Sequence, residues 1–285
     1  MVSTFKTTVA ALVLAALIAG CGATVLPQVH NEGDRLTIAR NLYAVGEYGT
    51  VVDVLSGYVT TGTGNADIDQ AVYLLGLGYL HQKEFASAQA QFERIARDYP
   101  ESDSANAAAY RLGVALYGQS RGADFDQEFS LKALTQWEAL VQSAPDDPWA
   151  ALARLRIAEG RSRLAHKLWR NGDVYLKLKL YDPAKVYFGS ILRDYADTPE
   201  YGDALIGDAV ANARLGHRDS ALTVLAGLAK EFEGHPLGLR AAATLARVRT
   251  WPAAGDVKHN RHRSVEPTQA APQSPTPSTT TPFGP

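Results

Sequence analysis

The stretch "LGLGYLHQKEFASAQAQFERIARDYP" (residues 75–100) contains two apolar segments joined by a polar turn. Its apolar residues recur at three- and four-residue spacing, which is typical of helices that bury one face. The positions that carry this pattern are Leu75-Gly76, Tyr79, Ala88, Phe92 and Pro100. Glycine and alanine let two antiparallel helices approach closely, and the proline ends the second helix because it has no amide donor. The stretch therefore predicts a helical hairpin.

The intervals within this hairpin match the tetratricopeptide pattern, a helix–turn–helix repeat of about 34 residues. The same frame fits four more segments, with varying completeness: 36–58, 112–145, 172–195 and 205–228. In the third repeat the step between the helices is longer, and the additional residues fall within "YGQSRGADFDQEFS" (117–130). Repeats in register indicate one stacked array. We therefore predict an all-α fold, a tetratricopeptide-repeat α-solenoid of about five helical hairpins over residues 35–250.

The first helix of the fourth repeat is expected to be unusually long. From Pro148 to about Leu180 the only helix breaker is Gly172, which predicts a helix of about 30 residues, or ~45 Å. Two Asp-Pro pairs, Asp147-Pro148 and Asp182-Pro183, are expected to start helices, with the aspartate as the cap and the proline at the first helical position.

Near the start of the chain one charged residue, Lys6, precedes about a dozen small or apolar residues from Val9 to Gly20. This run is too short to span a bilayer and is typical of an export signal. The run ends at Ile18-Ala19-Gly20-Cys21, which resembles the bacterial lipobox. Cys21 is the only cysteine in the chain, so it cannot form an intrachain disulfide. The alternative is an ordinary signal peptide followed by a cysteine that occurs by chance. A lipid attached to Cys21 accounts more simply for a single cysteine at this position. We predict a lipoprotein signal peptide at 1–20 and a lipidated tether at 21–34, with the membrane reached through the lipid anchor.

Composition limits the other classes of function. The formal net charge is −2, so no nucleic-acid binding is expected from bulk electrostatics. Residues 251–285 are rich in Pro, Thr and Ser and poor in Leu, Ile and Val. Such a segment buries too little apolar surface to offset its ordering entropy, and we predict a disordered tail.

In tetratricopeptide arrays the first helix of each repeat lines the concave surface. In the first two repeats the inward-facing positions predict a peptide groove that contains Leu36, Arg40, Tyr43, Tyr73, Leu77 and His81. An extended peptide that ends in an aromatic residue and a carboxylate would suit this groove, with rings for stacking and Arg40 for the carboxylate. Alternatively, the two tyrosines simply pack against neighbouring helices.

The long fourth-repeat helix is also basic. A docking surface for an acidic partner would contain Arg161, Arg163, Lys167 and Arg170. The alternative is an ordinary solvated helix face.

No catalytic or cofactor pattern emerges from the sequence. The seven histidines are scattered, and no cluster of cysteine, histidine or carboxylate ligands with metal-site spacing accompanies them. No serine elbow or Cys/His nucleophile pair occurs. We expect no metal, no cofactor and no enzymatic activity.

The stretch "RSRLAHKLWRNGDVYLKLKLYDPAKVYFGSILRDYADTPEYGDAL" (161–205) resembles the fourth repeat of the BamD family of outer-membrane assembly lipoproteins. The matching positions are Arg163-Leu164-Ala165, Tyr175-Leu176-Lys177, Ala184, Phe188 and Leu192-Arg193-Asp194-Tyr195. The resemblance covers about residues 30–230 and departs from the family at Ala196, where a proline is usual, and in the tail.

The resemblance implies a non-catalytic scaffold at the periplasmic face of the outer membrane. It would bind the periplasmic domains of a BamA-like barrel insertase through the later repeats. Unfolded outer-membrane proteins would bind to the early repeats by their aromatic-ended C-terminal segments. The competing hypothesis is another repeat lipoprotein that coordinates cell-wall or Tol–Pal processes, which would need neither the third-repeat insertion nor the region around Arg163.

Overall fold

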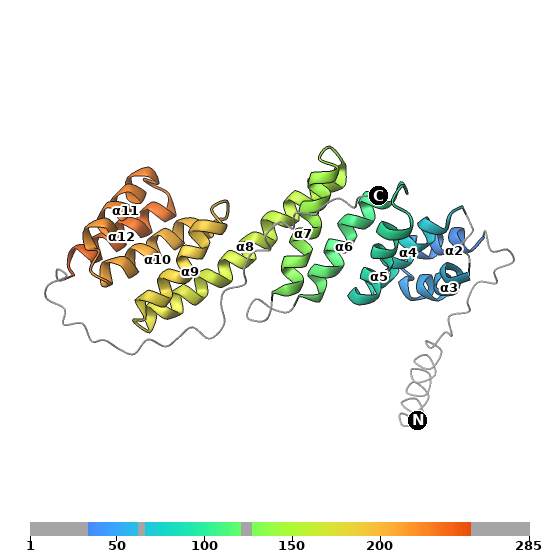
Figure 1. The fold of residues 1–285 in the computed structure, drawn as a ribbon, viewed down its shortest axis with the longest axis horizontal. Coiled ribbons are helices and arrows are strands. Elements are labelled where there is room, and N and C mark those ends of the chain that lie inside the picture. The colour runs from blue at the N-terminus through green and yellow to red at the C-terminus, as the bar shows by residue number, and fades with distance from the viewer. Residues whose placement is uncertain (1–33, 62–65, 121–126, 252–285) are drawn as a thin grey trace, which may run out of the picture.

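The computed structural model describes residues 34–61, 66–120 and 127–251, which form helices packed one after another along the chain (Figure 1). No strand occurs within these ranges. The helices are α2 (Asp34–Ala44), α3 (Tyr48–Thr61), α4 (Ile68–His81), α5 (Phe85–Asp98), α6 (Ala105–Gln119), α7 (Glu128–Ser143), α8 (Pro148–Lys177), α9 (Tyr181–Asp194), α10 (Glu200–Arg214), α11 (Arg218–Glu231) and α12 (Pro236–Arg249). The pairs α2–α3 to α10–α11 are hairpins, which confirms the predicted all-α solenoid. The single helix α12 that follows them was not predicted.

Three of the hairpins close where a glycine of the first helix meets a ring of the second. A Cβ on Gly113 would lie 2.2 Å from the Trp137 ring, far inside van der Waals contact. Trp137 is buried, and its indole nitrogen donates to the Tyr110 carbonyl oxygen at 3.0 Å. The same glycine–ring contact is made by two further pairs, Gly76 with Phe92 and Gly172 with Phe188. The repeat pattern therefore reflects close helix approach.

Four hairpins turn through a residue with positive φ. Glycine occupies this position in the first and fifth hairpins (Gly46, φ 85°; Gly216, φ 100°), and lysine in the second and fourth (Lys83, φ 63°; Lys179, φ 61°). The left-handed conformation lets the backbone reverse direction at once, and glycine adopts it without the strain that a Cβ introduces.

The 30-residue helix α8 joins two lobes, and its predicted length is confirmed (Figure 1). Its start is capped by Asp147, whose carboxylate accepts from the Trp149 amide at 2.7 Å. Buried residues up to Leu164 belong to one core with α2–α7, whereas from Ala165 onward they pack with α9 and α10. A further core cluster lies among α10, α11 and α12. We call residues 34–164 the N-terminal lobe and residues 165–251 the C-terminal lobe.

Two local expectations were wrong. Asp182 does not cap α9, which begins at Tyr181, because the Lys179 turn lets the Leu180 amide bond the Tyr175 carbonyl and starts the helix early. Pro183 then falls in the first turn, where a missing amide donor costs little. Trp251, assigned to the tail, instead packs on the α10–α12 cluster, with Arg214 3.6 Å above its ring.

The predicted lipidation site Cys21, the signal 1–20, nearly all of the tether and the tail beyond Trp251 lie outside the described residues.

Candidate functional site

The predicted groove residues lie on the first helices of the first two hairpins, and two polar contacts join these helices. Arg40 of α2 donates to the side-chain oxygen of Gln70 on α4. The Tyr43 hydroxyl lies 2.9 Å from Nε2 of His81. Leu36 and Leu77 are buried, so they belong to the core beneath the groove.

A cavity of about 370 Å³ lies at the Arg40 end of the groove. Its lining consists of Arg40, Asp69, Gln70, Tyr73, Leu74, Leu77, Asp103 and Ser104. Tyr73 also packs against Phe92, with ring centroids 6.0 Å apart, so it is both a packing residue and part of the cavity wall. Two carboxylates therefore share this end of the groove with the Arg40 guanidinium.

An aromatic cluster lies at the other end of α2. The His81 ring stacks on Tyr48 with centroids 4.0 Å apart, and Tyr43 meets both rings edge-on. Burial raises the pKa of Tyr43, and the positive charge of Arg111 partly opposes this increase. The groove thus continues toward α6, which carries Arg111.

Sequence analysis missed this continuation of the groove along α6 and the part of α8 that belongs to the N-terminal lobe. Tyr110 and Tyr117 each meet an arginine of α8: the Tyr110 hydroxyl accepts from Arg156 at 3.4 Å, and the Tyr117 hydroxyl accepts from Arg163 at 3.1 Å. The Arg163 guanidinium also lies 5.3 Å from the centre of the Tyr117 ring. The inward-position rule could have found both tyrosines, because they occupy in the third repeat the positions that Tyr73 and Leu80 occupy in the second.

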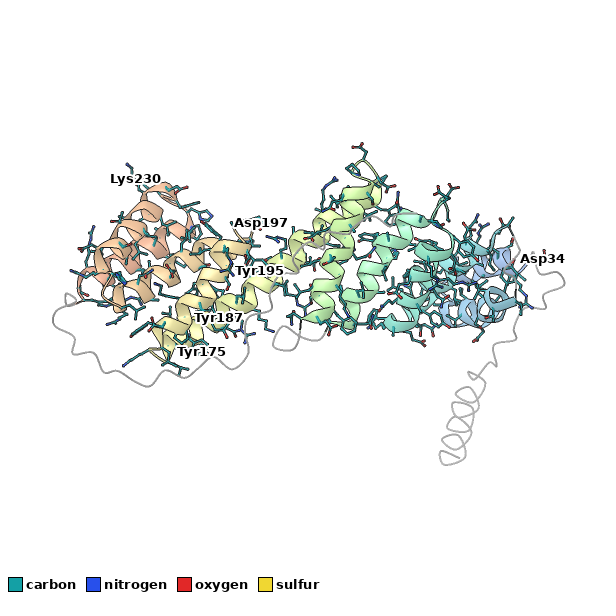
Figure 2. All side chains as sticks on the ribbon, in the orientation of Figure 1. Asp34, Tyr175, Tyr187, Tyr195, Asp197 and Lys230 are labelled. Carbon is teal, nitrogen blue, oxygen red and sulfur yellow. The ribbon has the colours of Figure 1, made fainter. Side chains whose placement is uncertain are left out.

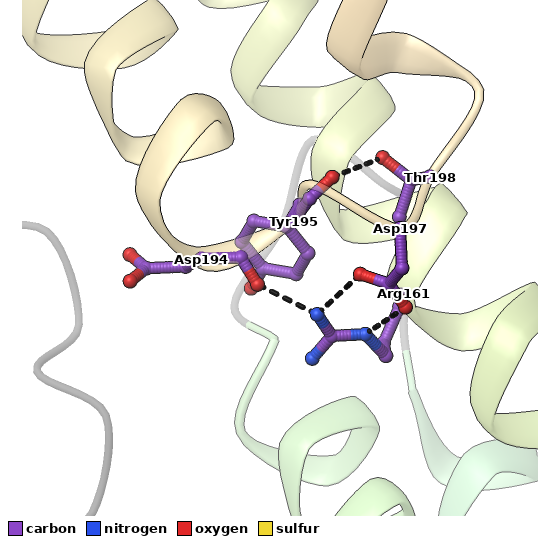
Figure 3. A network of polar contacts seen from close by, with 5 residues as sticks. All are labelled: Arg161, Asp194, Tyr195, Asp197 and Thr198. Atoms are coloured by element: carbon purple, nitrogen blue, oxygen red, sulfur yellow. Dashed lines mark hydrogen bonds and ion pairs between the residues drawn. The ribbon is translucent and has the colours of Figure 1, made fainter.

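Arg161 makes a contact between α8 and the C-terminal lobe (Figure 3). It donates to both carboxylate oxygens of Asp197, at 2.9 and 2.6 Å, and to the Asp194 carbonyl oxygen at 2.6 Å. Its guanidinium lies 5.2 Å from the Tyr195 ring centre. These hydrogen bonds lower the pKa of Asp197 and raise that of Arg161. We call this set of contacts the Arg161 clamp.

The four predicted docking residues therefore do not form one surface, because their contacts and positions along α8 differ. Arg161 holds Asp197 and Tyr195, which lie where α8 meets the C-terminal lobe (Figure 2). Arg163 contacts Tyr117 of the N-terminal lobe. Lys167 is half-buried and Arg170 is exposed farther along α8. Of the four, only these last two lie on the part of α8 that belongs to the C-terminal lobe.

Residues 34–61, 66–120 and 127–251 contain no group of three or more His, Cys, Asp or Glu side chains that could hold a metal ion. In the same ranges, every helix is too short or too polar to cross a membrane.

The fold defines a helical-repeat protein with a cavity between the first helices of its N-terminal hairpins. The model of the family described as "YfiO: Outer membrane lipoprotein" matches residues 66–226. That match covers more than half of the chain, which therefore belongs to this family of outer membrane lipoproteins. The outer membrane protein assembly factor BamD of Caulobacter vibrioides is 25% identical over 235 residues, which cover 80% of this chain and 76% of that protein. The BamD resemblance is thus confirmed at family level.

Two solved structures are also similar. One is a thermophilic tetratricopeptide-repeat protein of Thermus thermophilus, 18% identical, with a TM-score of 0.34, 76% of this chain covered and 100% of that one. The other is YrrB, described as a tetratricopeptide-repeat protein with an unusual peptide-binding site, 20% identical, with a TM-score of 0.33 and coverage of 75% and 92%.

Proposed function

We propose that this chain is a non-catalytic, lipid-anchored scaffold at the periplasmic face of the outer membrane that assists the assembly of β-barrel proteins. The main support is a groove of tyrosines and arginines on the N-terminal lobe of a BamD-family lipoprotein. The lipobox ending at Cys21 supports the anchor.

In this proposal the groove binds unfolded outer-membrane proteins by an extended segment that ends in an aromatic residue. Partly exposed rings such as Tyr43 and Tyr73 can stack on aromatic side chains of the segment. An arginine of the groove pairs with the terminal carboxylate, because a guanidinium forms strong, directional hydrogen bonds to such a group.

The C-terminal lobe is the proposed docking surface for the periplasmic domains of a BamA-like insertase. Lys167 and Arg170 lie on the part of α8 that belongs to this lobe, and they would face acidic side chains of the partner. Such charges mainly increase the association rate and fix the orientation of the complex.

The groove can be tested with a peptide that copies the C-terminus of a barrel protein. The double substitution Arg40→Glu with Tyr73→Ala is expected to weaken binding at least about tenfold, since it reverses one charge and removes one ring. Lys230→Glu in the C-terminal lobe is the matched charge-reversal control and is expected to leave affinity unchanged. Unchanged binding by the double variant would rule out the groove.

The partner can be tested by affinity isolation from gently solubilised native membranes, followed by mass spectrometry. A near-stoichiometric barrel protein with repeated periplasmic domains is the expected result. If proteins of the cell-wall or Tol–Pal systems appear without such a barrel, the proposed assembly role is wrong.

A further inference from the structure

Arg111 on α6 differs from the other groove arginines in its surroundings. Its guanidinium lies 5.6 Å from the centre of the Tyr110 ring and 5.4 Å from that of Trp149. Its Nε is buried and has no hydrogen-bond partner in the structure, and no carboxylate of the described residues forms an ion pair with it. A buried donor without a partner is costly, so this group is prepared to bind an acceptor.

The other groove arginines already have polar partners. Arg40 donates to Gln70, Arg156 to Glu159 at 2.8 Å, and Arg163 to the Tyr117 hydroxyl. Three of the four arginines are therefore engaged within the chain.

Charge also disfavours an anion beside Arg40. Asp69 and Asp103 line the same cavity as Arg40, and two carboxylates repel a third in the same confined space. The sequence-based assignment of the peptide carboxylate to Arg40 therefore conflicts with the electrostatics of this end of the groove.

Tyr43, Tyr73 and Arg111 lie on the first helices of three successive hairpins, α2, α4 and α6. The two residues directly before α6, Asp103 and Ser104, line the cavity together with Arg40 and Tyr73. The positive charge of Arg111 also opposes the increase that burial causes in the pKa of Tyr43. A peptide lying across these helices would pass Tyr43 and Tyr73 and reach Arg111.

We propose that Arg111, and not Arg40, binds the terminal carboxylate of an extended peptide held in the groove. The proposal rests on the peptide-binding function proposed above. The Tyr110 and Trp149 rings contact the guanidinium as cation–π partners. This contact orients the charge before the ligand arrives and limits the entropy lost on binding.

The test uses the purified full chain and two short synthetic peptides that end in phenylalanine, one with a free carboxylate and one with a C-terminal amide. Calorimetry or fluorescence anisotropy gives the ratio of their affinities. For the unsubstituted chain the free acid is expected to bind about ten- to a hundredfold more tightly, as for one charge-assisted hydrogen bond. In Arg111→Gln this ratio is expected to fall to about one, and in Arg111→Lys to be partly retained, because lysine keeps the charge but not the planar fork. In Arg40→Gln the preference is expected to persist.

The ratio separates a local effect from misfolding, because both peptides require the same folded groove. If the unsubstituted chain binds both peptides equally, or if Arg40→Gln removes the preference while Arg111→Gln keeps it, the Arg111 assignment is overturned and peptide binding itself stands. If neither peptide binds, the groove function fails and the assignment fails with it.

Discussion

The two lobes use arginine in different ways. In the N-terminal lobe Arg111 and Arg163 lie against aromatic rings of α6 and α8. In the C-terminal lobe three arginines join helices: Arg240 pairs with Asp203 at 2.8 Å, Arg218 donates to the last carbonyl oxygens of α12, and Arg214 lies over the Trp251 ring. These three contacts fasten α10, α11 and α12 to one another, whereas Arg111 keeps a buried Nε without a hydrogen-bond partner.

Under the proposed function the two lobes would divide the labour across α8. The C-terminal lobe would provide the docking surface for the insertase, and the N-terminal lobe, with Arg111 beside aromatic rings, would provide the peptide site.

The largest effects on stability are expected from removing one large buried side chain from the core of either lobe. Trp137 and Phe188 are both 1% exposed, and replacing either by alanine is expected to cost about 3–5 kcal/mol of unfolding free energy. Since each belongs to a different core cluster, hydrogen exchange should show loss of protection mainly in the lobe that carries the substitution. Peptide binding should be lost with Trp137→Ala and retained with Phe188→Ala. Equal loss of protection in both lobes after either change would mean that they fold as one unit.

Removal of the Arg161 clamp is expected to have the next largest effect on stability. The Arg161 side chain is about one quarter exposed and makes three hydrogen bonds, so Arg161→Met is expected to destabilise the chain by about 1–2 kcal/mol in urea unfolding. Arg193→Met is the matched control, because Arg193 is exposed and solvent screens its pairing with Asp194. If the two variants were equally stable, the clamp would have no special role at the junction of the lobes.

The same clamp predicts a dependence on pH. The folded chain holds the pKa of Asp197 below its usual value, chiefly through the Arg161 hydrogen bond. The carboxylate therefore contributes stability that is fully present above the unfolded pKa of about 4 and is lost as pH falls through the lower folded value. The difference in unfolding free energy between the unsubstituted chain and Asp197→Asn should be constant from neutral pH to about pH 5 and shrink below about pH 4. A constant difference throughout would contradict this linkage.

Local residue chemistry explains which features could be predicted from the sequence. The hairpins could be predicted because small residues and large apolar residues recur at fixed spacing, as at Gly113 and Trp137. Helix α12 was also detectable, since Pro236 starts it and apolar residues recur along it from Leu237 to Val248, but the five-repeat frame ended before it.

Non-local contacts could not be predicted in the same way. Arg161 was assigned to a docking surface because it lies on a basic helix. Its partner Asp197 is 36 positions away, and no spacing rule pairs residues at that separation. The unusual setting of Arg111 likewise depends on Trp149, which reaches it from the start of α8. Tertiary packing decides which charged residues remain available to a ligand.

Asp208 can be compared with Asp197, because this half-buried carboxylate of the C-terminal lobe has a lysine and an asparagine as its polar neighbours in place of an arginine. Burial raises its pKa, although the charge of Lys185 and a hydrogen bond from Asn212 act in the opposite direction. Because the pKa of Asp208 is higher in the folded chain than in the unfolded chain, ionisation of this carboxyl lowers the unfolding free energy at pH values above the unfolded pKa. Asp208→Asn is expected to increase stability at pH 7 by less than about 1 kcal/mol, and the gain should vanish below about pH 4. A loss of stability at pH 7 would show that the carboxylate is needed.

The smallest expected effects lie in the turns, where the two lobes can be compared at equivalent positions. Lys83 and Lys179 adopt the left-handed conformation, at φ 63° and 61°. Replacing either by glycine removes strain of about 1 kcal/mol or somewhat more, part of which is offset by the greater entropy of the unfolded chain. Each variant should therefore be more stable by a few tenths of a kcal/mol, measurable as a small rise in Tm.

Gly46→Ala is the reciprocal control for the turns. Gly46 has φ 85°, and a Cβ placed on its backbone would have no atom within 4 Å, so the substitution introduces strain without a clash and should destabilise the chain by about 1 kcal/mol. If both lysine variants lowered Tm while Gly46→Ala left it unchanged, the side chains of these lysines, and not the backbone conformation, would set the stability of the turns. In that case the lysine side chains would stabilise each lobe through their own contacts, and a comparison of the stability of the two lobes would have to include those contacts.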